Sequence, residues 1–302
     1  MPCNKGKQTV NLALTVLEIV APVFLLAGIG FTWVKLGFEY RIQFVTQLAM
    51  TLSVPCLIFT SLMRTEIDPT ALTTLTLASL AAYGGVTVAA WALVRLMDLS
   101  RRTYLAPMIF GNTGNLGLPL ALFAFGDVGL SYAIVVFAIM AIWSFTFGIW
   151  LVAGAGSLNK VLREPLVGAT LLGALFLWQD WETPTFLTNT LVLVGQMAIP
   201  IMLITLGVAV ARLSPGGIGR AIWLSVLKLA LCVAIAWGVA EIFDLGHVAF
   251  GVLVLQVATP VAVTSYLLAE KYGADAQEVA GLVVVSTLLA VGALPLLLAV
   301  LL

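Results

Sequence analysis

Long apolar runs follow one another through most of this 302-residue chain, and short charged or turn-rich pieces separate them. A helix of about 20 apolar residues is long enough to cross the hydrocarbon core of a bilayer. Hydrophobic residues make up 62% of the chain and charged residues only 9%, whereas a soluble domain is about one quarter charged. Because a soluble fold of this length could not bury so much apolar surface, the sequence predicts an all-α polytopic membrane protein.

The apolar runs predict about ten transmembrane helices joined by short connectors. Their expected ranges are 10–34, 42–63, 70–96, 103–126, 129–152, 165–179, 185–211, 218–241, 247–270 and 277–301. The longest connector, 153–164, divides the chain nearly in half. We therefore expect two five-helix units, residues 1–152 and 165–302, with the connector 153–164 between them on the cytoplasmic side.

Landmark residues of the first half recur at matching places in the second half. The pairs are Trp33 with Trp178, Pro55 with Pro200, and Phe125-Gly126 with Tyr272-Gly273, at offsets of 145, 145 and 147. Each half holds an odd number of predicted spans, so the two halves must enter the membrane with opposite orientations. An inverted repeat of this kind is the plan of many secondary carriers.

The basic residues predict the orientation of the chain, since cytoplasmic loops are enriched in lysine and arginine. One side is predicted to hold Lys5, Lys7 and Arg64, and the other side ten basic residues: Lys35, Arg41, Arg95, Arg101, Arg102, Lys160, Arg163, Arg212, Arg220 and Lys271. This asymmetry predicts a multi-pass protein of the cell (inner or plasma) membrane with both termini outside the cytoplasm.

A polar, helix-breaking stretch interrupts the fourth predicted span. Gly111 to Pro119 reads Gly-Asn-Thr-Gly-Asn-Leu-Gly-Leu-Pro inside an otherwise apolar run. Glycine and proline weaken a helix, and proline removes a backbone donor. In hydrocarbon a freed backbone group costs several kcal/mol unless protein or a watery cavity satisfies it. The stretch is therefore a candidate substrate site of a carrier. The alternative is a kinked structural helix whose asparagines bond a neighbouring helix.

The inverted repeat supplies a counterpart in the ninth span. At an offset of 147, Asn112-Thr113 falls on Thr259-Pro260, within a second polar, proline-broken stretch that begins at Gln256. Two broken helices in corresponding positions are expected to cross near the membrane midplane, and their half-helix N-termini suit an anion such as a carboxylate. The predicted substrate-binding residues at this crossing are Asn112, Thr113, Gly114, Asn115, Pro119, Gln256, Thr259 and Pro260.

Two further residues are candidates outside the breaks. Lys228 lies near the middle of the eighth span among apolar residues, where an unpaired ammonium would cost at least ~2.5 kcal/mol. It could attract an anion, stand in for a coupling cation, act as a proton-linked switch, or simply bind helix-end carbonyls at a break. Ser53 precedes Pro55 in the second span and would touch substrate if that helix lines the cavity.

The polar residues at the breaks are neutral, and no carboxylate accompanies them. Neutral amides and hydroxyls can bind a carboxylate without repelling it, and they can also coordinate sodium, so sodium or proton coupling stays open. The chain has three scattered cysteines, one histidine, and 14 basic against 14 acidic residues. We therefore expect no metal site, cofactor, catalytic constellation or nucleic-acid partner.

The run Asn112-Thr113-x-x-x-Gly117-Leu118-Pro119-Leu120 resembles the crossover motif of the auxin efflux carrier family, which includes plant PIN carriers and bacterial carriers of malate-like acids. Pro260, the run Ala269–Gly273, and a closing helix with Ser286-Thr287 and Pro295 resemble the C-terminal half of that family. By this resemblance, Asn112 and Pro119 belong to the first crossover and Pro260 to the second. The chain lacks the large hydrophilic loop of the plant proteins after helix five, so the substrate stays open among auxin, malate and other carboxylates.

The resemblance implies a fold like that of sodium/proton antiporters and bile-acid carriers. Helices 1, 2, 6 and 7 would form a scaffold, often a homodimer, and helices 3–5 and 8–10 a moving transport domain. The expected function is elevator-type transport of small organic anions through the lipid bilayer. The alternatives are a sodium-coupled solute symporter of the same fold and, from a different class, a membrane sensor that binds ligand without moving it.

Overall fold

The computed structural model describes residues 5–64, 69–148, 165–213 and 217–302, and these residues are almost entirely helical. The described residues form no strand. Gly111 and Val261 make an isolated antiparallel β-bridge. The elements are α1 (Lys5–Lys35), α2 (Ile42–Leu48), η1 (Ala49–Ser53), α3 (Val54–Met63), α4 (Pro69–Leu96), α5 (Arg101–Ile109), η2 (Thr113–Gly117), α6 (Leu118–Trp143), η3 (Ser144–Gly148), α9 (Pro165–Gln179), α10 (Thr185–Gln196), α11 (Ala198–Arg212), α12 (Ile218–Ile242), α13 (His247–Val257), α14 (Val263–Tyr272) and α15 (Ala276–Leu301).

By length and composition, seven helices in the described part of the chain can cross a membrane. They cover Leu14–Lys35, Ile42–Met63, Thr70–Leu96, Thr113–Trp143, Thr185–Arg212, Ile218–Ile242 and Ala276–Leu301, and two shorter apolar helices cover Gly168–Gln179 and His247–Val257. The prediction of an all-α polytopic membrane protein is thus confirmed. The count of ten spans stays a prediction, and the connector 153–164 lies outside the described residues.

The fourth and ninth predicted spans are interrupted where the sequence indicated. The fourth is divided into α5 and α6 around η2, and the ninth into α13 and α14. Near the expected end of the fourth span, Gly126 has φ 66° and ψ −158° inside α6. That backbone conformation is accessible to glycine at little cost. It marks the boundary that the sequence placed between the fourth and fifth spans.

The second and seventh predicted spans, which contain the matching prolines Pro55 and Pro200, are each interrupted just before the proline. Before Pro55 the chain makes the π-helical turn η1, and before Pro200 helix α10 ends at Gln196. Proline has no N–H, and its ring clashes with the carbonyl four residues earlier, which here belongs to Thr51 or Gln196. The interruptions relieve that clash.

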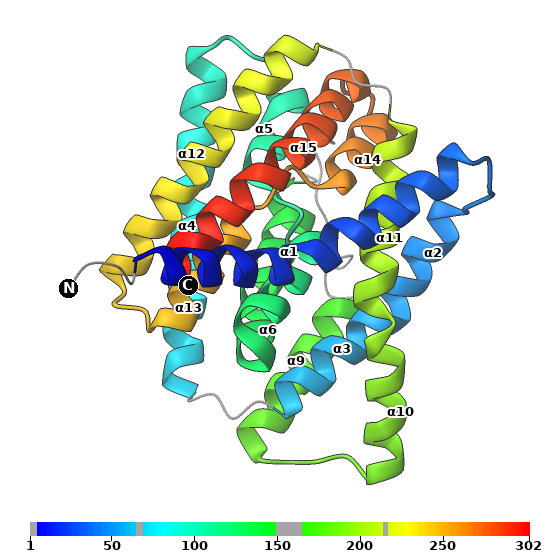
Figure 1. Cartoon of the computed structure of the whole chain (residues 1–302), viewed down its shortest axis with the longest axis vertical. Coiled ribbons are helices and arrows are strands. Elements are labelled where there is room, and N and C mark those ends of the chain that lie inside the picture. The colour runs from blue at the N-terminus through cyan, green and yellow to red at the C-terminus, as the bar shows by residue number, and fades with distance from the viewer. Residues whose placement is uncertain (1–4, 65–68, 149–164, 214–216) are drawn as a thin grey trace.

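The helices form two groups that lie side by side in Figure 1. Helices α2, α3, α9, α10 and α11 occupy one side, whereas α4, α5, α6 and α12 to α15 occupy the other. Helix α1 runs across the molecule and packs mainly against α11. Contacts between the groups run through α1, through η2 against α11, and through α6 against α3 and α9.

Small residues allow α1 and α11 to pack closely. A Cβ added at Gly30 would overlap the backbone carbonyl of Ile204, and one added at Gly207 would overlap the carbonyl of Ala27. Glycine at such contacts lets membrane helices approach at backbone distance, which maximises van der Waals contact.

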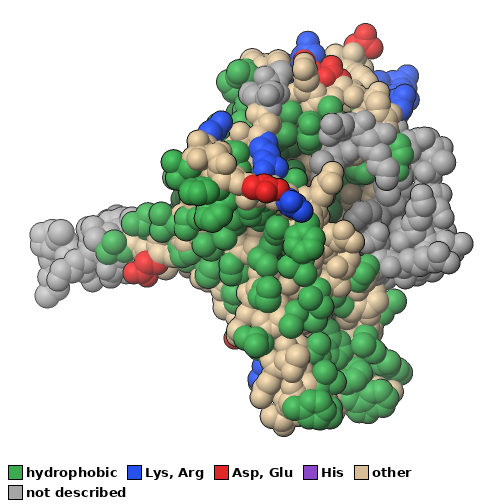
Figure 2. All heavy atoms as spheres, turned by 90° about the vertical axis from the view of Figure 1, so that its right-hand side faces the viewer, with side chains coloured by type: hydrophobic (Ala, Val, Ile, Leu, Met, Phe, Trp, Pro, Cys, Tyr) green, Lys and Arg blue, Asp and Glu red, His purple; other side chains and the backbone are tan. Residues whose placement is uncertain are grey.

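The outer surface is strongly apolar, as expected of a face toward lipid. Figure 2, seen from the side of α2, α10 and α11, shows hydrophobic side chains over the lower part and charged side chains gathered toward the upper part. Exposed large side chains in the chain include Trp178, Phe186 and Ile242, which are 78%, 75% and 80% exposed. A polar solvent would penalise so much apolar exposure, whereas lipid does not.

Candidate functional site

The two interrupted segments meet in the middle of the second helix group. Gly111 pairs with Val261 in the antiparallel bridge. Around that bridge, Asn112 N–H donates to the Pro260 carbonyl at 2.7 Å, and Ala262 N–H donates to the Phe110 carbonyl at 3.4 Å. Each break thus satisfies part of the backbone that the other leaves unpaired, as hydrocarbon surroundings require.

Two glycines of the first break make room for side chains of the second. A Cβ at Gly111 would overlap the hydroxyl of Thr259, and a Cβ at Gly117 would overlap the side-chain oxygen of Gln256. Thr259 is held in place, since its hydroxyl donates to the Gln256 carbonyl at 2.7 Å. Gly111 and Gly117 are therefore needed for the contact between the two breaks as well as for breaking the helix.

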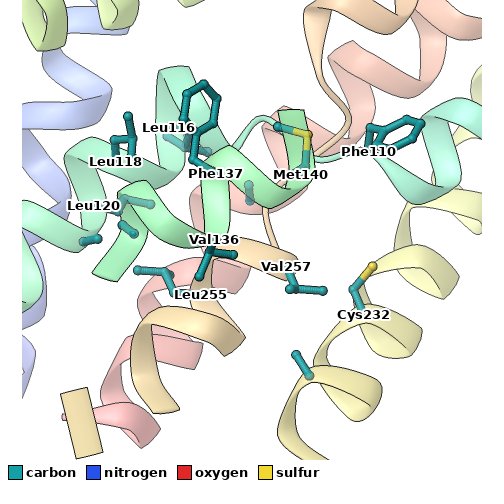
Figure 3. Packing of buried hydrophobic residues seen from close by; sticks show 14 of the residues in the cluster. Phe110, Leu116, Leu118, Leu120, Val136, Phe137, Met140, Cys232, Leu255 and Val257 are labelled. Atoms are coloured by element: carbon teal, nitrogen blue, oxygen red, sulfur yellow. The ribbon is translucent and has the colours of Figure 1, made fainter. Parts of the chain in front are cut away.

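Buried hydrophobic residues surround this meeting point. Figure 3 shows Leu116 beside Phe137 of α6 and Phe110 on the side of Met140 of α6, with Leu255 and Val257 of α13 in the same cluster. All are at most 8% exposed. The low dielectric of such surroundings strengthens any polar interaction within it and makes an unpaired polar group costly.

Several buried polar atoms near the breaks have no hydrogen-bond partner within the described residues. Asn112 and Thr113 are 5% and 0% exposed, and the Asn112 Nδ2 and Thr113 Oγ1 are unpartnered. Gln256 is fully buried, and both its Oε1 and its Nε2 are unpartnered. A buried unsatisfied polar group costs about 1–3 kcal/mol, so native proteins keep few of them without a reason. Their concentration here indicates a site that binds polar atoms.

Helix ends add an electrostatic bias to the same place. Helix η2 starts at Thr113 and continues directly into α6, and α14 starts at Val263. The first N–H groups of a helix have no intrahelical acceptor, and the N-terminus carries about half a positive charge. Two such ends beside unpartnered amide and hydroxyl groups favour a negatively charged ligand.

The second break is anchored by a hydroxyl of α15. Val261 N–H donates to Ser286 Oγ at 3.0 Å, and the Ser286 hydroxyl donates to the Val283 carbonyl at 3.3 Å. Ser286 is 5% exposed. The neighbouring Thr287 is 7% exposed and its hydroxyl has no partner within the described residues.

Replacing Ser286 is expected to destabilise the protein more than replacing Thr287. Ser286→Ala leaves the buried Val261 N–H without an acceptor, which costs about 1–3 kcal/mol. Thr287→Val, in which a methyl takes the place of the unpartnered hydroxyl, should cost less than ~0.5 kcal/mol. Thermal unfolding of the two purified variants in detergent checks this, and equal melting temperatures would contradict the anchoring role of Ser286.

Lys228 of α12 is buried beside both breaks. It is 2% exposed, and its Nζ donates to the Met108 carbonyl at 3.3 Å and to Cys232 Sγ at 3.8 Å. With Ser225, Thr259, Pro260 and Ser286, among others, it lines a small cavity with about 10 Å³ of free space.

The structure brings most of the predicted site residues together. Asn112, Thr113, Gln256, Thr259, Pro260 and Lys228 surround the meeting point. Gly114 approaches the Phe137 ring, 3.1 Å from an added Cβ, and Asn115 is only partly buried. Pro119 lies buried in the first turn of α6. Ser53 lies in η1, which packs against α9, α10 and α11. Of these helices, α11 also packs against η2.

Sequence reasoning gave no site role to two buried hydroxyls near the site. Ser225 lies one turn before Lys228 on α12, and Thr287 follows Ser286 on α15. Both hydroxyls are unpartnered within the described residues. For Ser225 a signal was available, since polar residues three positions apart share one helix face.

Each helix group has its own polar network. In the second group, Arg220 Nη1 donates to Tyr104 Oη at 3.0 Å, and Tyr104 O–H donates to Glu278 Oε2 at 2.8 Å. In the first group, Arg212 Nη2 donates to the Tyr40 carbonyl at 2.6 Å, and the hydroxyls of Tyr40 and Thr205 are 2.7 Å apart. Partial burial raises the pKa of the Tyr40 hydroxyl, which keeps it protonated for this bond. The networks stiffen each group internally.

Comparisons with known proteins identify the chain as similar to membrane transporters. A family described as membrane transport protein matches residues 15–162 and 156–298. A protein of Methanothermobacter thermautotrophicus, described as an uncharacterized transporter, is 27% identical over 294 residues, covering 92% of this chain and 96% of its own length. A second uncharacterized transporter, from Methanocaldococcus jannaschii, is 24% identical over 192 residues, covering 59% of this chain and 61% of its own length. The family match spans nearly the whole chain and confirms the resemblance that the crossover motif predicted. The chain therefore belongs to the membrane transport protein family, the family of the auxin efflux and PIN-like carriers.

Proposed function

We propose that this membrane transporter moves small organic anions, such as carboxylates, across the membrane by an elevator-type alternating-access mechanism. The observation that carries the proposal is the meeting of two interrupted helices that leaves Asn112 Nδ2 and Thr113 Oγ1 buried without partners. These donors stand where η2 and α6 begin, and α14 begins at Val263 in the second break, so a carboxylate would find hydrogen bonds and a favourable potential together.

The proposed architecture is a pair of inverted five-helix repeats, residues 1–152 and 165–302, whose broken helices 4 and 9 cross. In this reading α4, α5, α6 and α12 to α15 move as the transport domain, while α1, α2, α3 and α9 to α11 stay as the scaffold. The separate polar networks support it, because each ties helices of one group together. Rigid groups with mobile contacts between them are what a sliding transition needs.

The proposed function also implies a membrane location, an orientation and an oligomeric state for the protein. We place it in the cell (inner or plasma) membrane with both termini outside the cytoplasm, in contact with lipid. A homodimer through the scaffold helices would hold the scaffold still while the transport domain moves. Small carboxylates, malate-like acids among them, are the substrate class that the family resemblance favours.

One observation favours a second candidate, a sodium-coupled solute symporter. Gln256 Oε1 is buried and unpartnered beside the C-terminus of α13, and oxygen atoms at half-helix C-termini are the usual ligands of a coupling cation. Uptake that needs an imposed sodium gradient would support this candidate.

Asn112→Ala is expected to lower carboxylate transport by roughly 10- to 100-fold. A hydrogen bond to a charged group contributes about 1.5–3 kcal/mol, and 1.4 kcal/mol is tenfold. The measurement is uptake of radiolabelled malate, succinate or pyruvate into liposomes that contain the purified protein.

The matched control is Asn189→Ala, which removes an exposed asparagine of α10 and should leave uptake unchanged. Both variants should elute as folded protein on size exclusion. Wild-type uptake that Asn112→Ala leaves intact would refute the site, and saturable binding without any uptake would point instead to a membrane sensor.

A further inference from the structure

Lys228 is a buried charge without a carboxylate partner among the described residues. It is 2% exposed, and the ion pairs among the described residues are Arg41 with Glu39 and Arg220 with Glu278. Its neighbours are a backbone carbonyl and a thiol, at 3.3 and 3.8 Å. A charged residue in a membrane interior is costly and usually marks a function, so this arrangement needs a source of compensating negative potential.

The ends of two half-helices supply that potential. The Met108 carbonyl that accepts from Lys228 belongs to the last turn of α5, and the cavity that Lys228 lines includes Ala258, Thr259 and Pro260 just after the end of α13. A helix C-terminus carries about half a negative charge, so two of them offset roughly one positive charge. The Lys228 ammonium therefore bonds the C-terminal end of α5, and Lys228 shares a cavity with the residues that follow α13, at helix ends opposite in sign to the N-termini that begin at Thr113 and Val263.

The location of α12 argues against Lys228 as a substrate contact. Helix α12 packs against α4, α13 and α15, and in Figure 1 it lies at the edge away from α2, α3, α10 and α11. An elevator substrate would sit where η2 faces the scaffold helix α11. The cavity at Lys228 also has only about 10 Å³ free, which is room for about one water molecule.

We propose that the Lys228 ammonium occupies the position between the two half-helix C-termini that a coupling cation takes in sodium-driven carriers, so that this protein transports its anion without sodium. The inference rests on the proposed function and deepens it. The fixed positive charge neutralises the C-terminal ends permanently and leaves the N-terminal ends free to attract the anion. Ser225 Oγ, the Met108 carbonyl, Thr259 and Ser286 would surround any cation admitted in its place.

Two variants separate the charge of Lys228 from its volume. Lys228→Met keeps the length of the side chain and removes the charge, whereas Lys228→Ala removes both and opens space for a small cation. Uptake of radiolabelled malate into liposomes is measured in sodium chloride, ethylammonium chloride and choline chloride. Wild-type uptake should be equal in sodium and choline, and Lys228→Met should lose about tenfold or more in every salt. Lys228→Ala should lose as much in choline and recover at least in part in ethylammonium or sodium.

Melting temperatures give a readout that does not depend on transport. Sodium or ethylammonium should raise the melting temperature of Lys228→Ala relative to choline and leave that of the wild type unchanged, because only the variant has room for the cation.

The outcomes distinguish this inference from the proposed function. If no carboxylate is transported but this shift in melting temperature is seen, the proposed function is wrong and the cation position at Lys228 is supported. Wild-type uptake that requires sodium, full uptake by Lys228→Met, or a Lys228→Ala variant that no cation rescues or stabilises would overturn the inference. Malate stabilising the wild type but not Lys228→Met, with no cation effect on Lys228→Ala, would return Lys228 to the substrate contacts.

Discussion

Gly30→Ala is expected to destabilise the protein by about 3 kcal/mol or more. The added Cβ would overlap the backbone carbonyl oxygen of Ile204 in α11 and lie 2.8 Å from its carbonyl carbon. No side-chain rotation can relieve a clash with backbone, so α1 and α11 must move apart along their shared contact, the most extensive between any two helices of the described chain. Overpacking of this kind typically costs about 1–3 kcal/mol where side chains can adjust, and more where they cannot.

Gly28→Ala is the matched control, because it adds the same methyl to the same helix two residues earlier. A Cβ at Gly28 meets nothing within 4 Å. Alanine there should be neutral or slightly stabilising, since it favours the helix by up to ~1 kcal/mol over glycine. Thermal unfolding of both variants in detergent decides the matter. If Gly30→Ala melts at the wild-type temperature, the close approach of α1 and α11 is wrong.

Gly111→Ala is expected to reduce transport to background. Its Cβ would overlap Thr259 Oγ1 and come within 3.0 Å of the Thr259 carbonyl. Thr259 cannot turn away freely, because its hydroxyl is bonded to the Gln256 carbonyl. The two breaks must therefore separate, and the bond from Asn112 N–H to the Pro260 carbonyl is strained or lost. A displacement of about 1 Å in a positioned site can cost ~100-fold in rate.

Gly238→Ala of α12 is the control for this second substitution. A Cβ at Gly238 meets nothing within 4 Å, so uptake should match that of the wild type. The two variants are compared by malate uptake into liposomes at equal protein content. Wild-type uptake by Gly111→Ala would show that the contact between the breaks is not needed for transport.

Much of the helical layout follows from local sequence. Runs such as Ile218–Ile242 are helical because hydrocarbon leaves backbone groups no other partner than the same helix. The breaks at Asn112 and Pro260 were also predictable, since glycine and proline disrupt a helix wherever they cluster. The boundary between the fourth and fifth predicted spans was predictable as well, because Gly126 takes a non-helical backbone conformation there that glycine adopts at little cost.

The candidate site was predicted as a set of residues but not as a set of contacts. Symmetry between the halves indicated that Asn112 belongs near Pro260. It did not indicate that Gly117 makes room for Gln256 or that Ser286 accepts from Val261 N–H. The role of Ser53, chosen for its place beside Pro55, stays a prediction, because Ser53 lies in η1 against α9, α10 and α11, and η2 also packs against α11.

By itself, the sequence determined that this protein is a helical membrane protein, where two of its helices are broken, and to which family of transporters it belongs. These properties depend on composition, neighbouring residues and motif, which a linear chain already contains. Only the tertiary structure decided that the Lys228 ammonium meets the Met108 carbonyl, 120 positions earlier, at the end of a half-helix. That contact depends on how α12 packs against the rest of its group, because the position of a charge relative to a helix end is a property of packing and not of spacing.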